Sequence, residues 1–204
     1  MSEQFFPFDS VRQADGKGDR VYKSQDWANY YKNFITTGLM HNNGDVGLNV
    51  DRIENLQIFI SEGGAFIEGR QYLLNGEKAL QFEIEANHYR RDLVVLRMDS
   101  RINERSIKLQ IIKGVPNLEE AQAIAPELTR NENIYDLGLY TVLVKPQAVS
   151  INRDDIVDLR GDLNYCTLSN PKGFGGATIF VGKETPNPKY VKIGDLWLPE
   201  IEVL

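Results

Sequence analysis

The feature that most constrains the fold is a succession of short apolar segments with a two-residue period, separated by turns rich in glycine and asparagine. Apolar and polar side chains alternate in residues 56–60 and 80–84, whereas residues 93–96 form a continuous apolar run, as expected where both faces of a sheet are covered. No strand–helix–strand alternation supports a parallel α/β sheet. The pattern therefore predicts a mainly β fold, an antiparallel β-sandwich or a barrel-like arrangement. Further expected strands are residues 65–68, 71–74, 107–111 and 137–144.

Glycine-containing turns indicate where these segments reverse direction. We expect Gly63-Gly64 and Gly69-Arg70 to turn the chain, and Asn75-Gly76 to form a hairpin-type turn. Residues 100–104 are expected to form a hairpin tip, and residues 118–125 a short helix.

The N-terminal segment carries a concentration of aromatic residues. Phe5, Phe6 and Phe8 stand beside Pro7, and a turn rich in glycine and aspartate follows at residues 15–20. Rings so close to a terminus are costly to leave in water, so they must pack on the core of this chain or on a neighbouring protein. Such an arm is typical of a subunit that inserts into an assembly.

A short helix is predicted directly after the arm. Ser24 is expected to be its N-cap, Asp26 is an acidic residue of the first turn, and Gly38 is expected to end the helix. Four aromatic side chains fall at i, i+3, i+4 and i+7, so they share one helix face. At this spacing such a stripe belongs more often to a core or an interface than to a sugar-stacking site. The stripe consists of Trp27, Tyr30, Tyr31 and Phe34.

These N-terminal motifs also carry a resemblance to a known family. Phe-Phe-Pro-Phe-Asp-Ser at 5–10, Asp-Arg-Val-Tyr at 19–22 and Asp-Trp-Ala-Asn-Tyr-Tyr-Lys-Asn-Phe-Ile at 26–35 resemble the start of tail-tip and baseplate proteins of siphophages and prophages of Gram-positive bacteria. The chain is similar to the N-terminal shoulder domain of their receptor-binding and upper baseplate proteins. The likeness continues more loosely through residues 65–69, 91–97, 113–116 and 155–160.

The resemblance implies a virion structural protein and not an enzyme. It predicts an adaptor that attaches to the phage tail and holds or presents the host-adsorption apparatus. Its partners are expected to be other tail and baseplate proteins and further copies of itself, in a trimer or ring. The expected location is the virion tail tip, after synthesis in the host cytoplasm. The expected interface residues are Phe5, Phe6, Phe8, Trp27, Tyr30, Tyr31, Phe34 and Trp197.

An alternative function is a receptor-binding protein that contacts host cell-wall saccharides directly. Loops such as residues 42–45 or 131–133 would then contact the cell. The resembling receptor-binding proteins carry a longer distal head, for which this chain has no room, and that difference favours the adaptor.

Composition and charge exclude several other classes of function. The net charge of −6 and the pI near 5.1 argue against a nucleic-acid groove, which is normally basic. Cys166 is the only cysteine, so neither an intrachain disulfide nor a cysteine metal cage is possible. No apolar run reaches the length of a membrane helix, and the start lacks the pattern of a secretory signal, so neither membrane insertion nor signal-directed export is expected.

The candidates for catalysis are few and favour structural roles. Asp155 and Asp158 lie close in sequence to Arg153 and Arg160, and we expect ion pairs here in preference to a glycosidase carboxylate pair. His41 and His88 lack metal-ligand spacing. Cys166 is expected to be a buried structural thiol. We therefore predict no catalytic residue, no metal and no cofactor.

The chain is predicted to have three parts. Residues 1–40 form the arm and the helix, residues 41–166 form the β-sandwich, and residues 167–204 form a linker and a C-terminal extension. Two readings of that extension remain open. It docks another subunit, or it adds a C-terminal strand that packs on the main sandwich.

Overall fold

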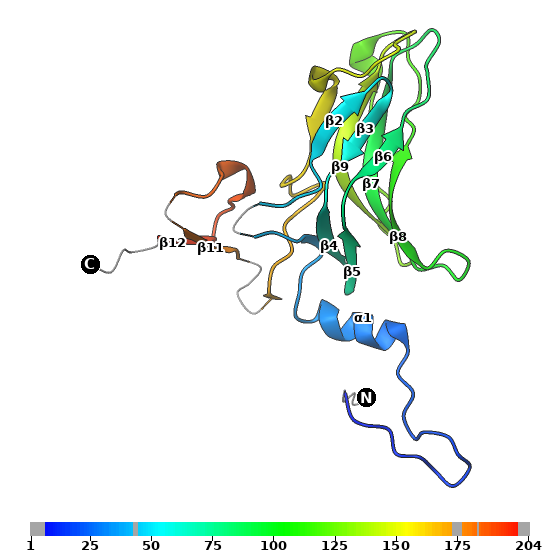
Figure 1. The fold of residues 1–204 in the computed structure, drawn as a ribbon, viewed down its shortest axis with the longest axis vertical. Coiled ribbons are helices and arrows are strands. Elements are labelled where there is room, and N and C mark those ends of the chain that lie inside the picture. Colours follow the sequence, from blue (N-terminus) through cyan, green and yellow to red (C-terminus); the bar gives the residue numbers. More distant parts are fainter. Residues whose placement is uncertain (1–6, 43–44, 173–176, 183, 200–204) are drawn as a thin grey trace.

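The structure is a computed structural model that describes residues 7–42, 45–172, 177–182 and 184–199. It is mainly β, with several antiparallel sheets packed into an elongated body (Figure 1). A helix, α1, and the N-terminal arm project from one end of this body, and a small two-stranded unit, β11–β12, lies to one side. The predicted mainly β class is confirmed.

The largest sheet has four strands in the order β10-β9-β7-β8, all antiparallel. Its central strands are β7 (Arg90–Asp99) and β9 (Ile134–Val144), flanked by β8 (Ser106–Ile112) and β10 (Ile156–Asp158). The predicted apolar run lies inside β7, where all four side chains are buried. Its predicted partner is confirmed as β8, joined to β7 by the expected hairpin tip.

Two three-stranded sheets complete the body, and each combines strands that are distant in sequence. One sheet has the order β2-β3-β6 and the other β1-β4-β5. The bounds are β1 Gly38–Leu39, β2 Val50–Glu54, β3 Gln57–Ile60, β4 Gly63–Ile67, β5 Arg70–Leu74 and β6 Lys78–Gln81. The sheets share one apolar core, to which Ile58 and Ile60 of β3, Ile67 of β4 and Leu96 of β7 each contribute a fully buried side chain.

Two of the predicted turns are wrong. Gly63 and Gly64 are the first residues of β4, and glycine is needed there because a Cβ on Gly63 would lie 2.6 Å from the Leu48 nitrogen. Asn75-Gly76 forms no hairpin, because β5 pairs with β4 whereas β6 pairs with β3. This turn instead carries the chain from one sheet to the other. The predicted turn at Gly69-Arg70 is confirmed one residue earlier, at Glu68-Gly69, where both residues have positive φ.

The predicted helix is confirmed as α1 (Ser24–Lys32), with different ends. Lys23 and not Ser24 is the N-cap, and its N–H donates to Asp26 Oδ2 at 2.7 Å, which satisfies one free backbone donor. The helix ends at Asn33, and Gly38 opens β1. The helix expected at residues 118–125 is reduced to one short turn, η1 (Glu120–Gln122).

The C-terminal part begins as a strand-like segment attached to the body. Leu39 donates its N–H to the Thr167 carbonyl and accepts from the Ser169 N–H, both at 2.8 Å. Further on, β11 (Ile179–Gly182) and β12 (Leu196–Pro199) pair in parallel with each other and with no other described strand. β12 therefore adds no strand to the main sheets, and both readings of the extension, docking of another subunit or packing on the sandwich, stay predictions.

Candidate assembly surface

The arm folds back on itself before it reaches α1. Val11 N–H donates to Asp19 Oδ1 at 2.7 Å, and Arg12 and Gly18 form an antiparallel bridge. Tyr22 closes the base of this hairpin, because its hydroxyl accepts from the Phe8 N–H at 3.1 Å and donates to the Phe8 carbonyl at 3.2 Å. The Phe8 ring is 58% exposed. The predicted interface residues Phe5 and Phe6 lie outside the described residues.

The helix is seated on the β4–β5 turn by a contact between backbones. Ala28 is the one buried residue of α1, at 2% exposure. It lies against Gly69, which has φ +78°, and a Cβ at that position would be 1.8 Å from the Ala28 carbonyl oxygen. Only glycine has both the backbone freedom and the absent side chain that this contact requires.

Side chains around this contact fix the orientation of the helix. Lys32 forms an ion pair with Glu68 of the turn, and Arg70 Nη2 donates to Gln25 Oε1 at 2.7 Å. Tyr31 packs edge-on to the Phe66 ring of β4, with 6.3 Å between ring centroids. The helix is therefore held at both ends and in the middle.

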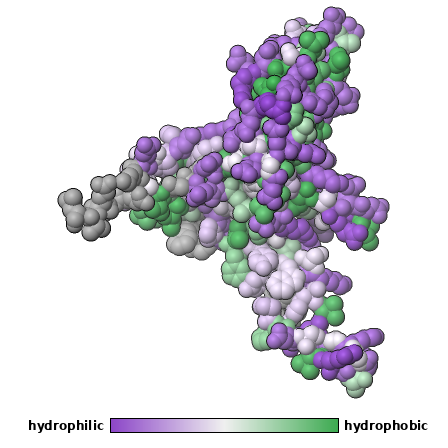
Figure 2. Space-filling view, viewed as in Figure 1, coloured by the Kyte–Doolittle hydropathy of each residue, from purple (hydrophilic) through white to green (hydrophobic). Residues whose placement is uncertain are grey.

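The four predicted aromatic residues form a continuous cluster, of which Tyr31 also contacts the seat through Phe66. We call Trp27, Tyr30, Tyr31 and Phe34 the aromatic ridge. Trp27 and Tyr31 are stacked with centroids 6.2 Å apart, and Tyr30 and Phe34 are 5.0 Å apart. Trp27, Tyr31 and Phe34 are 39%, 42% and 53% exposed, so the ridge is not core. In Figure 2 this region is pale, because tyrosine and tryptophan have intermediate hydropathy.

A second apolar surface lies on the β11–β12 pair, which we call the ribbon. Phe180 is its buried anchor, at 1% exposure, and Lys189 ties the ribbon to the body through an ion pair with Asp158 at 2.5 Å. The predicted interface residue Trp197 is 40% exposed, in register with Phe180. Figure 2 shows hydrophobic side chains gathered here.

The sequence prediction missed most of the apolar residues of the ribbon. Trp197 was singled out, but its exposed neighbours on both strands were not. The sequence feature that could have identified them is the recurrence of aliphatic residues in two segments, 179–181 and 196–198, that are too short to form a core of their own. The missed residues of the two strands are Ile179, Val181, Leu196 and Leu198, and exposed Ile193 lies just before β12.

The ridge and the ribbon are separate surfaces. Figure 1 places β12, which carries Trp197, to the side of the body, whereas α1 and the arm extend from its end. The structure therefore brings together the four ridge residues, with Tyr22 of the arm beside Trp27 at 6.4 Å between centroids. It does not bring Trp197 to them.

The acidic segment around Asp155 and Asp158 forms ion pairs, but only one of them has an expected arginine as partner. Asp158 binds Arg160 at 2.9 Å, whereas the partner of Asp155 is Lys145, at 2.6 Å. Burial alone would raise the pKa of the Asp155 carboxyl, but hydrogen bonds from Lys145 and the Asn152 backbone hold that pKa below its usual value. Both carboxylates are thus committed to structural contacts.

The histidines and the cysteine are also placed apart from one another. His41 contacts Asn170, with 3.3 Å between Nε2 and Oδ1, and His88 lies 3.6 Å from a Glu85 oxygen. Cys166 is fully buried, and burial raises the pKa of its thiol to about 12, as expected for a structural thiol. Within the described ranges, no three potential ligands are grouped so that they could hold a metal ion.

The described part of the chain contains no helix that is long and apolar enough to cross a membrane. Comparison of the sequence with known protein families and with curated proteins, and of the fold with solved structures, finds no match.

Proposed function

We propose that this protein is a structural component of the tail tip or baseplate of a long-tailed phage, an adaptor without enzymatic activity. The observation that carries the proposal is the aromatic ridge, exposed on a helix that is itself rigidly seated on the body. The resemblance of residues 5–35 to tail-tip proteins supplies the identity of the assembly. In this proposal the facing sheets of the body act as a β-sandwich that holds its neighbours.

The chemistry of the ridge suits adhesion. Aromatic side chains bury about 150–250 Å² each and dominate interface energetics. Buried aromatic residues are also frequent hot spots of binding. Because the Ala28–Gly69 contact already fixes the helix, little conformational entropy remains to be lost when a partner covers the ridge. The ridge is thus preorganised for binding.

Self-association in a closed ring or trimer is part of the proposal. Closed rotational symmetry is the usual solution for identical subunits, and it fits attachment to a tail axis. The ridge and the ribbon are two different surfaces of one chain. Two such surfaces allow one contact between copies and another with a tail protein.

The test measures absolute mass by light scattering after size exclusion, for the full chain and for a chain without residues 1–22. A trimer or larger ring that is lost on truncation supports self-assembly through the arm. Trp27→Ala is expected to have the same effect as the truncation. Ile102→Ala is the matched control, because Ile102 is 77% exposed at the β7–β8 hairpin tip and is not part of the ridge. A monomer in every form contradicts self-assembly.

A tail partner is tested separately, by incorporation of tagged variants into phage particles during infection. Trp27→Ala should be excluded from particles while Ile102→Ala is incorporated. Equal incorporation of both variants would contradict the adaptor role of the ridge.

The alternative function, direct contact with cell-wall saccharides, is favoured by one observation. The side chain of Asn131 accepts from the Asn133 and Ile134 N–H groups, both at 2.9 Å, so this exposed polar loop is fixed in shape. Under this alternative, substitutions in the loop remove cell binding and leave assembly intact.

A further inference from the structure

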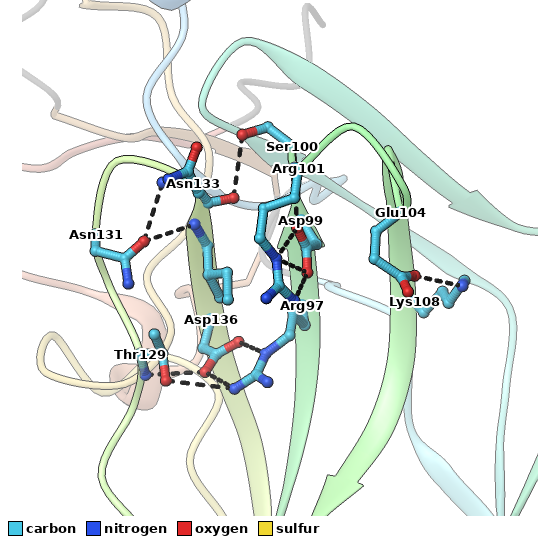
Figure 3. A network of polar contacts seen from close by, with 11 residues as sticks. Arg97, Asp99, Ser100, Arg101, Glu104, Lys108, Thr129, Asn131, Asn133 and Asp136 are labelled. Atoms are coloured by element: carbon cyan, nitrogen blue, oxygen red, sulfur yellow. Dashed lines mark hydrogen bonds and ion pairs between the residues drawn. The ribbon is translucent and has the colours of Figure 1, made fainter.

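The outer face of the four-stranded sheet carries a polar pocket that the tail function does not use. Its floor is formed by cross-strand neighbours, because Arg97 is paired with Lys108 and Asp99 with Ser106. Gln110 extends the same face of β8, and the pocket holds about 170 Å³. Figure 3 shows Arg97, Asp99 and Arg101 of this lining close together, with the Glu104–Lys108 pair to one side of them.

The charges of the pocket are balanced in three ion pairs. Arg97 binds Asp136 through two hydrogen bonds of 2.7 Å, and Asp136 is fully buried. Arg101 binds Asp99 through Nε at 3.0 Å and Nη2 at 2.5 Å. Lys108 lies 3.3 Å from Glu104. The lining thus holds three cations and two carboxylates, while the third carboxylate, Asp136, is buried beneath Arg97, and an ionic ligand of either sign would meet a like charge.

Several hydrogen-bonding groups nevertheless have no partner in the described part of the protein. These are Nη1 of Arg97 and of Arg101, the Ser106 hydroxyl and the Gln110 amide. The guanidinium groups are donors only, whereas hydroxyl and amide groups both donate and accept. Since each arginine is held in place by a bidentate carboxylate, its free edge is fixed in direction.

We propose that this pocket binds one unit of a neutral saccharide. A sugar ring presents adjacent hydroxyl groups, each both donor and acceptor, which matches a charge-balanced set of fixed donors beside amide and hydroxyl groups. The volume suits a single ring. The loop at 131–133 adjoins the pocket, because Ser100 at the end of β7 donates its N–H to the Asn133 carbonyl at 2.8 Å. The proposal names a site for the alternative function and does not depend on tail assembly.

The test is a titration of the full-length, isotope-labelled protein followed by amide NMR. The probes are methyl α-glucopyranoside, methyl β-galactopyranoside, methyl α-rhamnopyranoside, N-acetylglucosamine and inorganic phosphate. At least one sugar should shift the amides of residues 97–110 in a saturable way. Phosphate should leave them unchanged.

Variants distinguish this pocket from unspecific binding. Ser106→Ala with Gln110→Ala removes two groups that have no partner in the described structure, so the fold is kept and the affinity should fall about tenfold. Arg101→Ala should also weaken binding. Arg52→Ala is the matched control, because Arg52 is an exposed arginine paired with Glu54 and Glu77 on another sheet.

Three results would overturn the proposal. They are the absence of a saturable shift with every sugar, a shift with phosphate alone, and equal loss of affinity in Arg52→Ala and Arg101→Ala. None of these results affects the mass and incorporation experiments. A negative result for saccharide binding can therefore be told apart from a negative result for the adaptor function.

Discussion

Gly69 and Ala28 approach so closely that no side chain fits between the β4–β5 turn and α1. A Cβ on Gly69 would lie 1.8 Å from the Ala28 carbonyl oxygen, in a residue whose φ is +78°. The position of the helix, and with it that of the aromatic ridge, therefore depends on the absence of a side chain at Gly69.

Gly69→Ala should displace the helix and destabilise the fold by about 2–4 kcal/mol, because backbone strain and a steric clash act together. Gly76→Ala is the control, since Gly76 also has positive φ, +90°, but its Cβ would meet nothing within 4 Å. That variant should lose only about 1 kcal/mol. Denaturant unfolding measures both values. Equal losses would show that strain alone, and not the contact with Ala28, matters at Gly69.

Trp27→Ala should change the free energy of unfolding of the isolated chain by less than about 1 kcal/mol, because Trp27 is 39% exposed and its ring packs on rings of the arm and the helix and not on the core. Phe180→Ala, which removes a buried ring, should cost about 3–5 kcal/mol of local stability in the ribbon. Urea unfolding of the first variant and hydrogen exchange of β11 amides in the second provide the measurements. A large loss in Trp27→Ala would mean that the ridge is part of the core.

Stability should decrease in acid through Asp155. Its pKa is held below the usual value in the folded state, so its contribution is complete above the unfolded pKa, near 4, and is lost as pH falls through the folded pKa. Asp155→Asn should therefore lower stability at neutral pH and flatten the decrease towards pH about 3. Its exposed neighbour Asp154 is the control, and Asp154→Asn should follow the unmodified protein. Parallel curves for Asp155→Asn and the unmodified protein would contradict this role.

Cys166 should not react with iodoacetamide in the native protein at neutral pH. Its side chain is fully buried, and burial raises the pKa of the thiol to about 12, so the reactive thiolate is scarce and shielded. Mass spectrometry after timed labelling measures the rate. The exposed variant Ser150→Cys should be labelled at once at the new position. Fast labelling of Cys166 itself would show local opening of its surroundings.

Local patterns in the sequence predicted the strands better than their pairing. Alternation identified β3 and β8, and the apolar run identified β7, because both patterns are formed by residues that are neighbours in the sequence. The separation of β5 and β6 into different sheets follows from contacts with β4 and β3, which no local pattern contains. The pattern predicts a turn at Gly63, because a chain reversal and a close approach to another segment, here Leu48, both require glycine.

The helix illustrates the same limit at the candidate surface. Helical spacing identified the four aromatic residues of one face, but it does not say which face is buried. That choice depends on Gly69, forty-one positions after Ala28, and on the ion pair between Lys32 and Glu68. The fixed loop at residues 131–133 and the pocket beside it likewise depend on register between strands.

The residues that seat α1 on the body are largely different from the aromatic residues that form the exposed ridge. Because the helix is anchored by the Ala28 backbone and by the side chains of Gln25, Tyr31 and Lys32, the rings of Trp27 and Phe34 can be exchanged without loss of an anchoring contact. In the proposed adaptor, exchange of these rings would change the partner that is recognised while the reach and angle of the ridge stay the same. Selection on binding and selection on folding then act on different atoms of the same short segment.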